Sequence, residues 1–135
     1  MAVAPRVSIE FRPAALADHV RIEMSGEFSL EEILPLCDRC FRFAADAGRD
    51  AMLVDVRGIT GREPTIAERY EWAVRVADLQ AGFVPRIRVA LLGHEPLIHP
   101  ERFGEIVAAR RGAVARTFTD EDGALRWLVG GTAAA

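Results

Sequence analysis

The sequence predicts a single α/β domain with a mixed five-stranded sheet and about four helices in the order ββαβαβαβα. Its 135 residues are enough to bury a core without disulfides or metal ions. The chain opens with two segments that alternate apolar and polar residues, and three further apolar segments each precede a helical pattern. Strands that alternate with helices favour parallel pairing through right-handed crossovers, whereas the opening pair adds an antiparallel portion.

The first half of the predicted sheet starts from the two alternating segments, residues 6–11 and 19–24, which the segment 12–18 joins as an antiparallel hairpin. Ser29 and Glu32 fit a capping box, so a helix is predicted to begin near Ser29. Its apolar residues at helical spacing are Leu30, Ile33, Leu34, Cys37, Phe41 and Ala44.

Residues 51–56 form a nearly continuous apolar run, which is typical of a central strand. Gly58 and Gly61 then indicate a tight turn, and Thr65 with Glu68 repeats the capping-box pattern. A second helix is predicted from Thr65 to about Ala81. The residues expected on its buried face are Ile66, Tyr70, Ala73, Val74 and Ala77, with Arg69 off that face.

The second half of the chain repeats the strand and helix pattern twice. A strand over 86–93 precedes a helix over 99–112, with Pro100 in its first turn and Phe103, Ile106 and Val107 facing the core. A strand over 114–120 precedes a last helix over 119–128, capped by Thr119, whose Trp127 and Leu128 close the core. The domain core spans about 6–129, and 130–135 is expected to be a frayed tail.

Composition and charge argue against several classes of protein. The net charge is −3 and all 17 basic residues are Arg scattered along the chain, so a nucleic-acid surface is not expected. No segment approaches the ~20 apolar residues that span a bilayer, and the first residues do not resemble a signal peptide. We therefore expect a cytoplasmic protein without a membrane span.

The sequence shows no catalytic constellation, so we expect no enzyme activity, no cofactor and no metal. Cys37 and Cys40 lie well inside a helical pattern, away from the helix start that activates redox cysteines. His94 and His99 are five residues apart across a loop that contains proline, with no helix to bring them together as metal ligands.

The turn at 57–65 has three interpretations that the residues leave open. It lacks the spacing and the lysine of a nucleotide-binding P-loop. Arg57, Arg62 and the amides before the helix can hold a small anion. Thr60 or Thr65 can be phosphorylated, or the turn is purely structural, with Thr65 as the helix cap.

Open α/β sheets bind ligands at the carboxyl ends of their strands. His94 ends a strand at the edge where the 57–65 turn is expected, so it is a candidate for a ligand cleft there. The candidate binding residues are Arg57, Thr60, Arg62, Glu63, Thr65 and His94.

The element order and the segments "LVDVRGITG", "RVALLG" and "ARTFTDEDGALRWL" resemble the STAS or SpoIIAA-like superfamily of anti-sigma-factor antagonists. The resemblance covers nearly the whole chain, and its motifs are structural: Phe118, Ala124, Leu125, Trp127 and Leu128. In that family a serine preceded by aspartate, at the start of the helix after the central strand, can be phosphorylated to switch a protein interface. Here Glu63 is near the acidic position and Pro64, which cannot accept phosphate, is near the acceptor.

The resemblance implies a non-enzymatic STAS-like regulatory or protein-interaction module that uses the turn 57–65 and the helix it opens. The alternative is a small-molecule or lipid-like ligand-binding domain with a cleft at the carboxyl ends of the strands. An enzyme built on Arg57, Glu63 and His94 has no supporting motif. The expected partner is a protein or a small apolar ligand, and a homodimer stays open.

Overall fold

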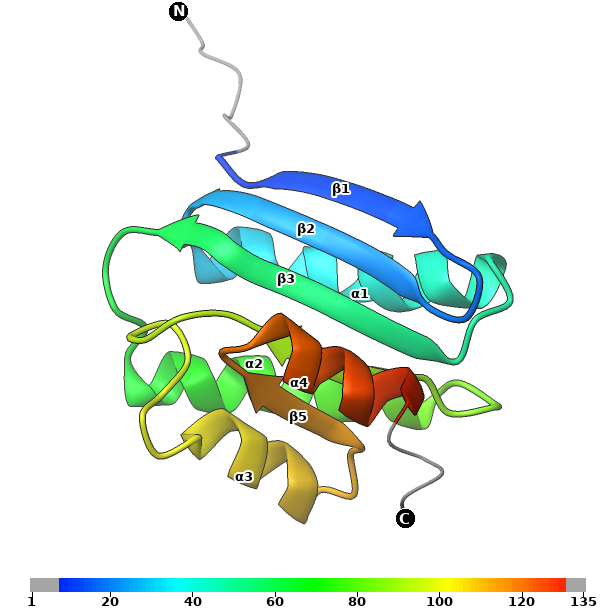
Figure 1. The fold of residues 1–135 in the computed structure, drawn as a ribbon. Helices are drawn as coiled ribbons and strands as arrows, with labels where there is room; N and C mark the ends of the chain where they lie inside the picture. Colours follow the sequence, from blue (N-terminus) through cyan, green and yellow to red (C-terminus); the bar gives the residue numbers. More distant parts are fainter. Residues whose placement is uncertain (1–7, 131–135) are drawn as a thin grey trace, which may run out of the picture.

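The computed structural model describes residues 8–130, which form a five-stranded sheet covered by helices (Figure 1). The strands are β1 (Glu10–Ala15), β2 (Val20–Glu27), β3 (Ala51–Thr60), β4 (Arg88–Leu92) and β5 (Ala115–Phe118). The helices are α1 (Leu30–Asp46), α2 (Ile66–Ala81), α3 (Phe103–Arg110) and α4 (Glu121–Leu125), which continues as a π-helical turn over Arg126–Gly130. The predicted class and element order are confirmed.

The strands lie in the sheet in chain order, β1-β2-β3-β4-β5. β1 pairs antiparallel with β2, so Phe11 lies beside Met24. The other pairs are parallel, with Ile22 beside Val54 and Val54 beside Leu91. The sheet is therefore mixed, as predicted, and the carboxyl ends of β2 to β5 meet at one edge.

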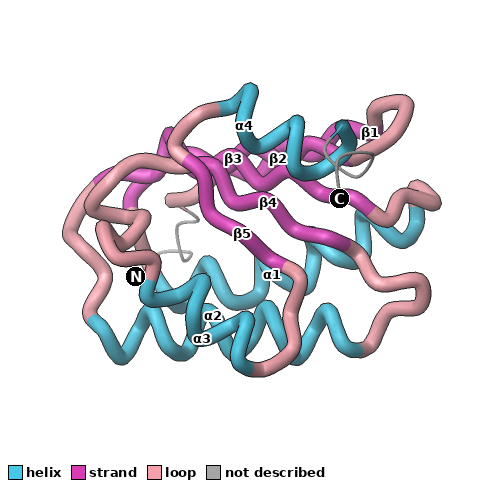
Figure 2. The backbone as a smooth tube through the Cα atoms, turned by 60° about the horizontal axis from the view of Figure 1, so that its bottom comes forward, coloured by secondary structure: helices cyan, strands magenta, loops and turns pink. Residues whose placement is uncertain are grey.

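Helices cover both faces of the sheet, with α1, α2 and α3 on one face and α4 on the other (Figure 2). Side chains alternate along a strand, so Met52, Val54 and Val56 of β3 pack in the larger cluster with α1. Ala51 and Leu53 pack in the smaller cluster with α4. Because both faces are covered, β3 is apolar at nearly every position over 51–56.

The first strand differs from its predicted position. β1 spans Glu10–Ala15, whereas the sequence predicts a strand over 6–11, of which residues 6 and 7 lie outside the described residues. β1 therefore contains Pro13, in a segment predicted as loop. Proline is tolerated because β1 lies at the edge of the sheet, where a missing N–H breaks no pairing on the solvent side.

The predicted capping box at the start of α1 is wrong, because the Ser29 side chain makes no capping hydrogen bond. The Glu32 carboxylate instead accepts from the backbone N–H groups of Ser8 at 2.8 Å and Ile9 at 3.0 Å. The chain before β1 thus crosses Gly26, whose φ is 137°. A Cβ atom at this position would lie 1.9 Å from the Ser8 carbonyl oxygen, so only glycine fits.

The starts of the last two helices also differ from the prediction. α3 begins at Phe103, so Pro100 precedes the helix. Asp120, not Thr119, caps α4: its side chain accepts from Gly123 N at 2.7 Å. Both residue types serve as helix caps, so the sequence alone does not decide between adjacent positions.

The buried faces of the helices follow the prediction in α1 and α4 but not in α3. Ile33, Cys37, Phe41 and Ala44 of α1 are buried, whereas Ile106 of α3 is half exposed. Ala124 and Leu128 are buried in the smaller cluster, and Trp127 packs against it. The Arg88 guanidinium lies 4.5 Å from the centre of the Trp127 ring. The last helix therefore closes the core on its face of the sheet, as predicted.

Within residues 8–130, no helix combines the length and the apolar character needed to cross a membrane. Of the predicted frayed tail over 130–135, only Gly130 is among the described residues.

Candidate functional site

The link between β3 and α2 is shorter than the predicted 57–65 turn. β3 continues through Thr60, with Gly58 beside Ser25 of β2 and Thr60 beside Glu27. A Cβ atom on Gly58 would lie 2.7 Å from the Ser25 Cβ, so this glycine permits close strand contact and does not form a turn. Only residues 61–65, called here the β3–α2 connection, leave the sheet, and Gly61 turns the chain with a φ of 102°.

Thr65 caps α2, as the sequence predicts. Its hydroxyl oxygen accepts from Glu68 N at 3.1 Å, and the Glu68 carboxylate accepts from Thr65 N at 2.9 Å. Two of the N–H groups that a helix start leaves without intrahelical partners are thereby satisfied.

Arg62 adds a bidentate ion pair to this cap, with both terminal nitrogens 2.6–2.7 Å from the Glu68 carboxylate oxygens. Its guanidinium also lies 5.2 Å from the centre of the Phe28 ring. The hydrogen bonds from Arg62, followed by that from the Thr65 N–H, lower the pKa of Glu68 to about 2. Two donors that the anion hypothesis assigns to a ligand, the Arg62 guanidinium and the Thr65 N–H, thus already have acceptors within the chain.

Arg69 joins the β3–α2 connection to the loop after β4. Its side chain is only 5% exposed. The guanidinium donates to the carbonyl oxygens of Leu97 at 2.7 Å and Pro96 at 2.6 Å, and it lies 3.4 Å from the Glu63 carboxylate. The prediction that Arg69 lies off the buried face of α2 is therefore wrong. The signal that could have placed it inward is its spacing of four from Ala73, itself four residues before Ala77.

The outer face of α2 carries two residues that were predicted to be buried. Ile66 is 53% exposed and Tyr70 is 49% exposed. The buried residues of α2 are Arg69, Ala73, Ala77 and Gln80. The helix is thus rotated relative to the prediction, and Ile66 and Tyr70 lie one turn apart on its solvent side.

Arg57 lies on the α4 face of the sheet and not in the β3–α2 connection. Its guanidinium is 2.8 Å from the Asp55 carboxylate and 2.9 Å from that of Glu121 in α4. Arg21 of β2 contacts the same two carboxylates, at 2.8 Å and 3.1 Å. Burial opposes ionisation of Asp55, but the hydrogen bonds and charges of Arg57, together with the charge of Arg21, lower its pKa. These four residues fasten α4 to the sheet.

The two remaining candidate residues make few contacts. The Thr60 hydroxyl donates to the Gly26 carbonyl oxygen at 3.4 Å. His94 is exposed after β4, and among residues 8–130 its ring makes no hydrogen bond. The structure therefore brings Arg62, Glu63 and Thr65 together, whereas Arg57 lies on the opposite face of the sheet.

The two cysteines are buried, and His99 makes a local hydrogen bond. Cys37 and Cys40 are free and buried. Burial raises the pKa of the Cys37 thiol to about 12. His99 Nδ1 accepts from Glu101 N at 3.0 Å. In the described part of the chain, no three histidine, cysteine or carboxylate side chains are grouped closely enough to hold a metal ion.

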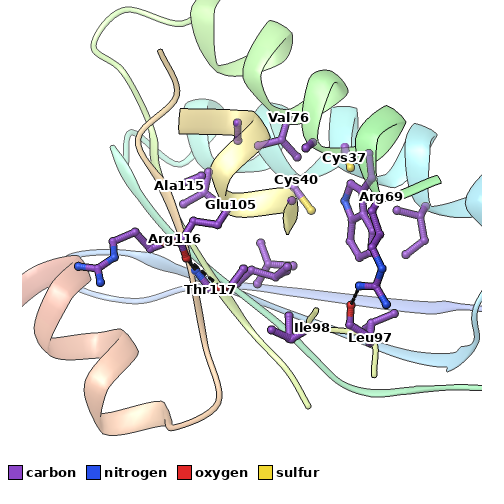
Figure 3. Close-up of a pocket in the computed structure, with 18 of the residues that line it drawn as sticks. Cys37, Cys40, Arg69, Val76, Leu97, Ile98, Glu105, Ala115, Arg116 and Thr117 are labelled. Atoms are coloured by element: carbon purple, nitrogen blue, oxygen red, sulfur yellow. Dashed lines mark hydrogen bonds between the residues drawn. The ribbon is translucent and has the colours of Figure 1, made fainter. Parts of the chain in front are cut away.

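A cavity of about 110 Å³ lies between the sheet and the three helices on its larger face (Figure 3). Apolar side chains form most of its wall, including Cys40, Val76 and Ile98. The charged residues of the lining are Arg69, Arg102, Glu105 and Arg116. This cavity lies under the helices, and part of its wall, including Leu97 and Ile98, comes from the loop that follows the carboxyl end of β4.

No protein-family model matches the chain, and no curated protein matches its sequence. Its structure is similar to that of an anti-sigma factor antagonist from Mycobacterium paratuberculosis, with 13% identity, a TM-score of 0.60, and coverage of 90% of this chain and 94% of that chain. It is also similar to the anti-sigma factor antagonist SpoIIAA in its unphosphorylated form, with 11% identity, a TM-score of 0.51, and coverage of 87% and 96%. The predicted SpoIIAA-like fold is confirmed, and at these identities the similarity concerns the fold alone.

Proposed function

We propose that this SpoIIAA-like chain is a non-enzymatic regulatory module that binds a protein partner through the β3–α2 connection and the outer face of α2. The observation that carries the proposal is the exposure of Ile66 and Tyr70, two large apolar side chains that follow directly on the connection. Single exposed apolar residues are ordinary, but two that are one helical turn apart form a continuous surface.

The residues around this apolar pair suit a protein interface. Aromatic side chains such as Tyr70 are enriched among the residues that dominate binding energy. Arg62 and Glu63 are exposed in the connection that precedes the pair, and they would supply a polar rim. The Thr65 cap and the Arg62–Glu68 ion pair hold the connection in one conformation. Binding of a partner would therefore cost little conformational entropy in this segment.

Phosphorylation of the connection is not part of the proposal. The Thr65 hydroxyl already accepts from Glu68 N, and a phosphate there would face the carboxylates of Glu63 and Glu68. Arg62, the nearest cation in sequence, is paired with Glu68. Catalysis by Arg57, Glu63 and His94 is also not proposed, because Arg57 lies on the opposite face of the sheet from Glu63.

The proposal is tested by placing a photo-crosslinking amino acid at Tyr70 or, as a control, at Val84, in cells that naturally express the protein. Val84 is 97% exposed in the loop after α2, so it controls for contacts made by any exposed apolar side chain. Because both similar structures are of anti-sigma factor antagonists, an anti-sigma factor is the first partner to seek among the products. We expect a defined crosslinked protein from Tyr70 and none from Val84.

The affinity of the purified, crosslinked partner is then measured. Tyr70→Ser is expected to weaken binding by about tenfold or more, because exposed aromatic residues at an interface contribute strongly. Val84→Ser is the matched control and should leave the affinity unchanged. Melting curves check that both variants stay folded. A Tyr70→Ser variant that is folded and binds as tightly as the unchanged chain would contradict the proposed surface.

A further inference from the structure

The cavity on the larger face of the sheet has a largely apolar wall. Protein interiors are close-packed, and voids much larger than a water molecule are few. Here α1, α2, α3 and the sheet leave about 110 Å³ between them. The wall includes Phe41 of α1, Met52 of β3 and Ala108 of α3, each at most 3% exposed. Such side chains offer a ligand dispersion contacts and no hydrogen bonds.

Two charged residues of the lining are already engaged with other parts of the chain. Glu105 of α3 accepts from both the backbone N–H and the hydroxyl of Thr117, each at 2.8 Å (Figure 3). The terminal nitrogens of Arg69 donate to the carbonyl oxygens of Pro96 and Leu97. The remaining nitrogen of Arg69, Nε, is covered by protein atoms, so a molecule in the cavity does not reach it.

The other polar residues of the lining direct their groups elsewhere. The Arg116 guanidinium lies 5.6 Å from the centre of the Phe118 ring and 5.9 Å from that of Trp127, and both rings pack on the α4 face of the sheet. His99 Nδ1 accepts a local backbone hydrogen bond. Arg102 is exposed, so water hydrates its charge. A polar ligand would therefore lose hydration inside the cavity and gain few hydrogen bonds from side chains.

We propose that this cavity binds a small, uncharged apolar molecule, which shape and dispersion contacts hold in place. Cavities of about 150 Å³ lined by apolar side chains bind benzene. The cavity here measures about 110 Å³ and is partly open to solvent, so it suits a compact ring of roughly five or six non-hydrogen atoms. Because the side-chain polar groups of the lining are engaged elsewhere, the cavity selects against ligands that carry polar atoms.

The experiment compares benzene with pyrimidine, an uncharged ring of the same size and shape that carries two nitrogen acceptors. Isotope-labelled full-length chain is titrated with each at pH 7. Nuclear magnetic resonance follows the methyl groups of Val76 and Ile98, which line the cavity, and of Ala124, which packs on the other face of the sheet. Benzene is expected to shift the Val76 and Ile98 signals saturably and to leave that of Ala124 unchanged. Pyrimidine should bind about tenfold more weakly or less, because its nitrogens would lose hydration without new donors.

Two neighbouring residues of α3 supply a variant and its matched control. Ala108 lines the cavity and is buried, whereas Ala109 is exposed and does not line it. Ala108→Leu adds three carbon atoms to the wall and should weaken benzene binding by about tenfold or more. Ala109→Leu adds the same atoms on the solvent side and should leave the affinity unchanged. Ala73→Leu fills the cavity from α2 and is used if melting curves show that Ala108→Leu does not fold.

The proposal is overturned if benzene gives no saturable shift of the Val76 and Ile98 signals in the unchanged chain. Pyrimidine that binds as tightly as benzene would also refute it, because the cavity would then accommodate polar atoms. A folded Ala108→Leu or Ala73→Leu chain that keeps the full affinity for benzene would place the ligand outside this cavity. None of these measurements involves a protein partner, so the result is independent of the function proposed for the outer face of α2.

Discussion

Glu68 should contribute to stability in a pH-dependent way, which Glu68→Gln tests. In the folded chain its carboxylate accepts from Arg62 twice and from Thr65 N once. These contacts lower its pKa from the ordinary 4.5 to about 2. A group whose folded pKa is depressed stabilises the fold fully above its unfolded pKa, and this contribution is lost as the pH falls through the folded pKa.

The size of the Glu68 contribution follows from the same shift. A fall of the pKa from 4.5 to about 2 sets an upper limit of about 3.4 kcal/mol. Arg62 is 56% exposed, so water screens the pair, and exposed ion pairs contribute about 1 kcal/mol or less. We therefore expect Glu68→Gln to lower the free energy of unfolding by about 1 kcal/mol at pH 7.

The assay is urea unfolding of both chains between pH 7 and pH 2. The difference between them should be constant down to about pH 4.5 and should shrink toward pH 2, because the carboxyl becomes protonated in both states. Glu71→Gln, at an exposed position of the same helix without an ion pair among residues 8–130, should show no such trend. A difference that is independent of pH, or that grows at low pH, would refute the assigned role of the ion pair.

Further predictions concern the two ends of α2, namely the Thr65 cap and Gln80 in the last turn. Thr65→Ala should cost about 1 kcal/mol, or roughly 4 °C in Tm, measured by thermal unfolding, because Glu68 N loses its acceptor. Intact-mass measurement of protein from its native cells should show no phosphate on Thr60 or Thr65. A stoichiometric added phosphate would instead support the interpretation that phosphorylation of this connection switches a protein interface. Gln80→Leu removes three hydrogen bonds at 2.7–2.9 Å to Ile87 and Val114, and should lower the free energy of unfolding by about 3 kcal/mol. A loss below about 1 kcal/mol would mean that these bonds are replaced.

The sequence predicts those features that depend on local patterns. The apolar run over 51–56 predicts a central strand, and β3 is buried between α1 on one face of the sheet and α4 on the other. Thr65 and Glu68 are three residues apart, and their reciprocal hydrogen bonds form within a single helical turn. Both inferences succeed because they depend on neighbouring residues. The cap joins residues three positions apart, and the strand is recognised from a continuous run of apolar residues.

Three of the failed predictions involve partners that are distant in sequence. Glu32 lies three residues after Ser29, as a capping box requires, but it binds Ser8, which is 24 residues away. Arg57 directly precedes the two glycines that predict a turn, but it pairs with Glu121, which is 64 residues away. Arg69 is charged, yet its acceptor on Pro96, 27 residues away, permits burial of the side chain. A single sequence gives no sign of which distant groups will meet.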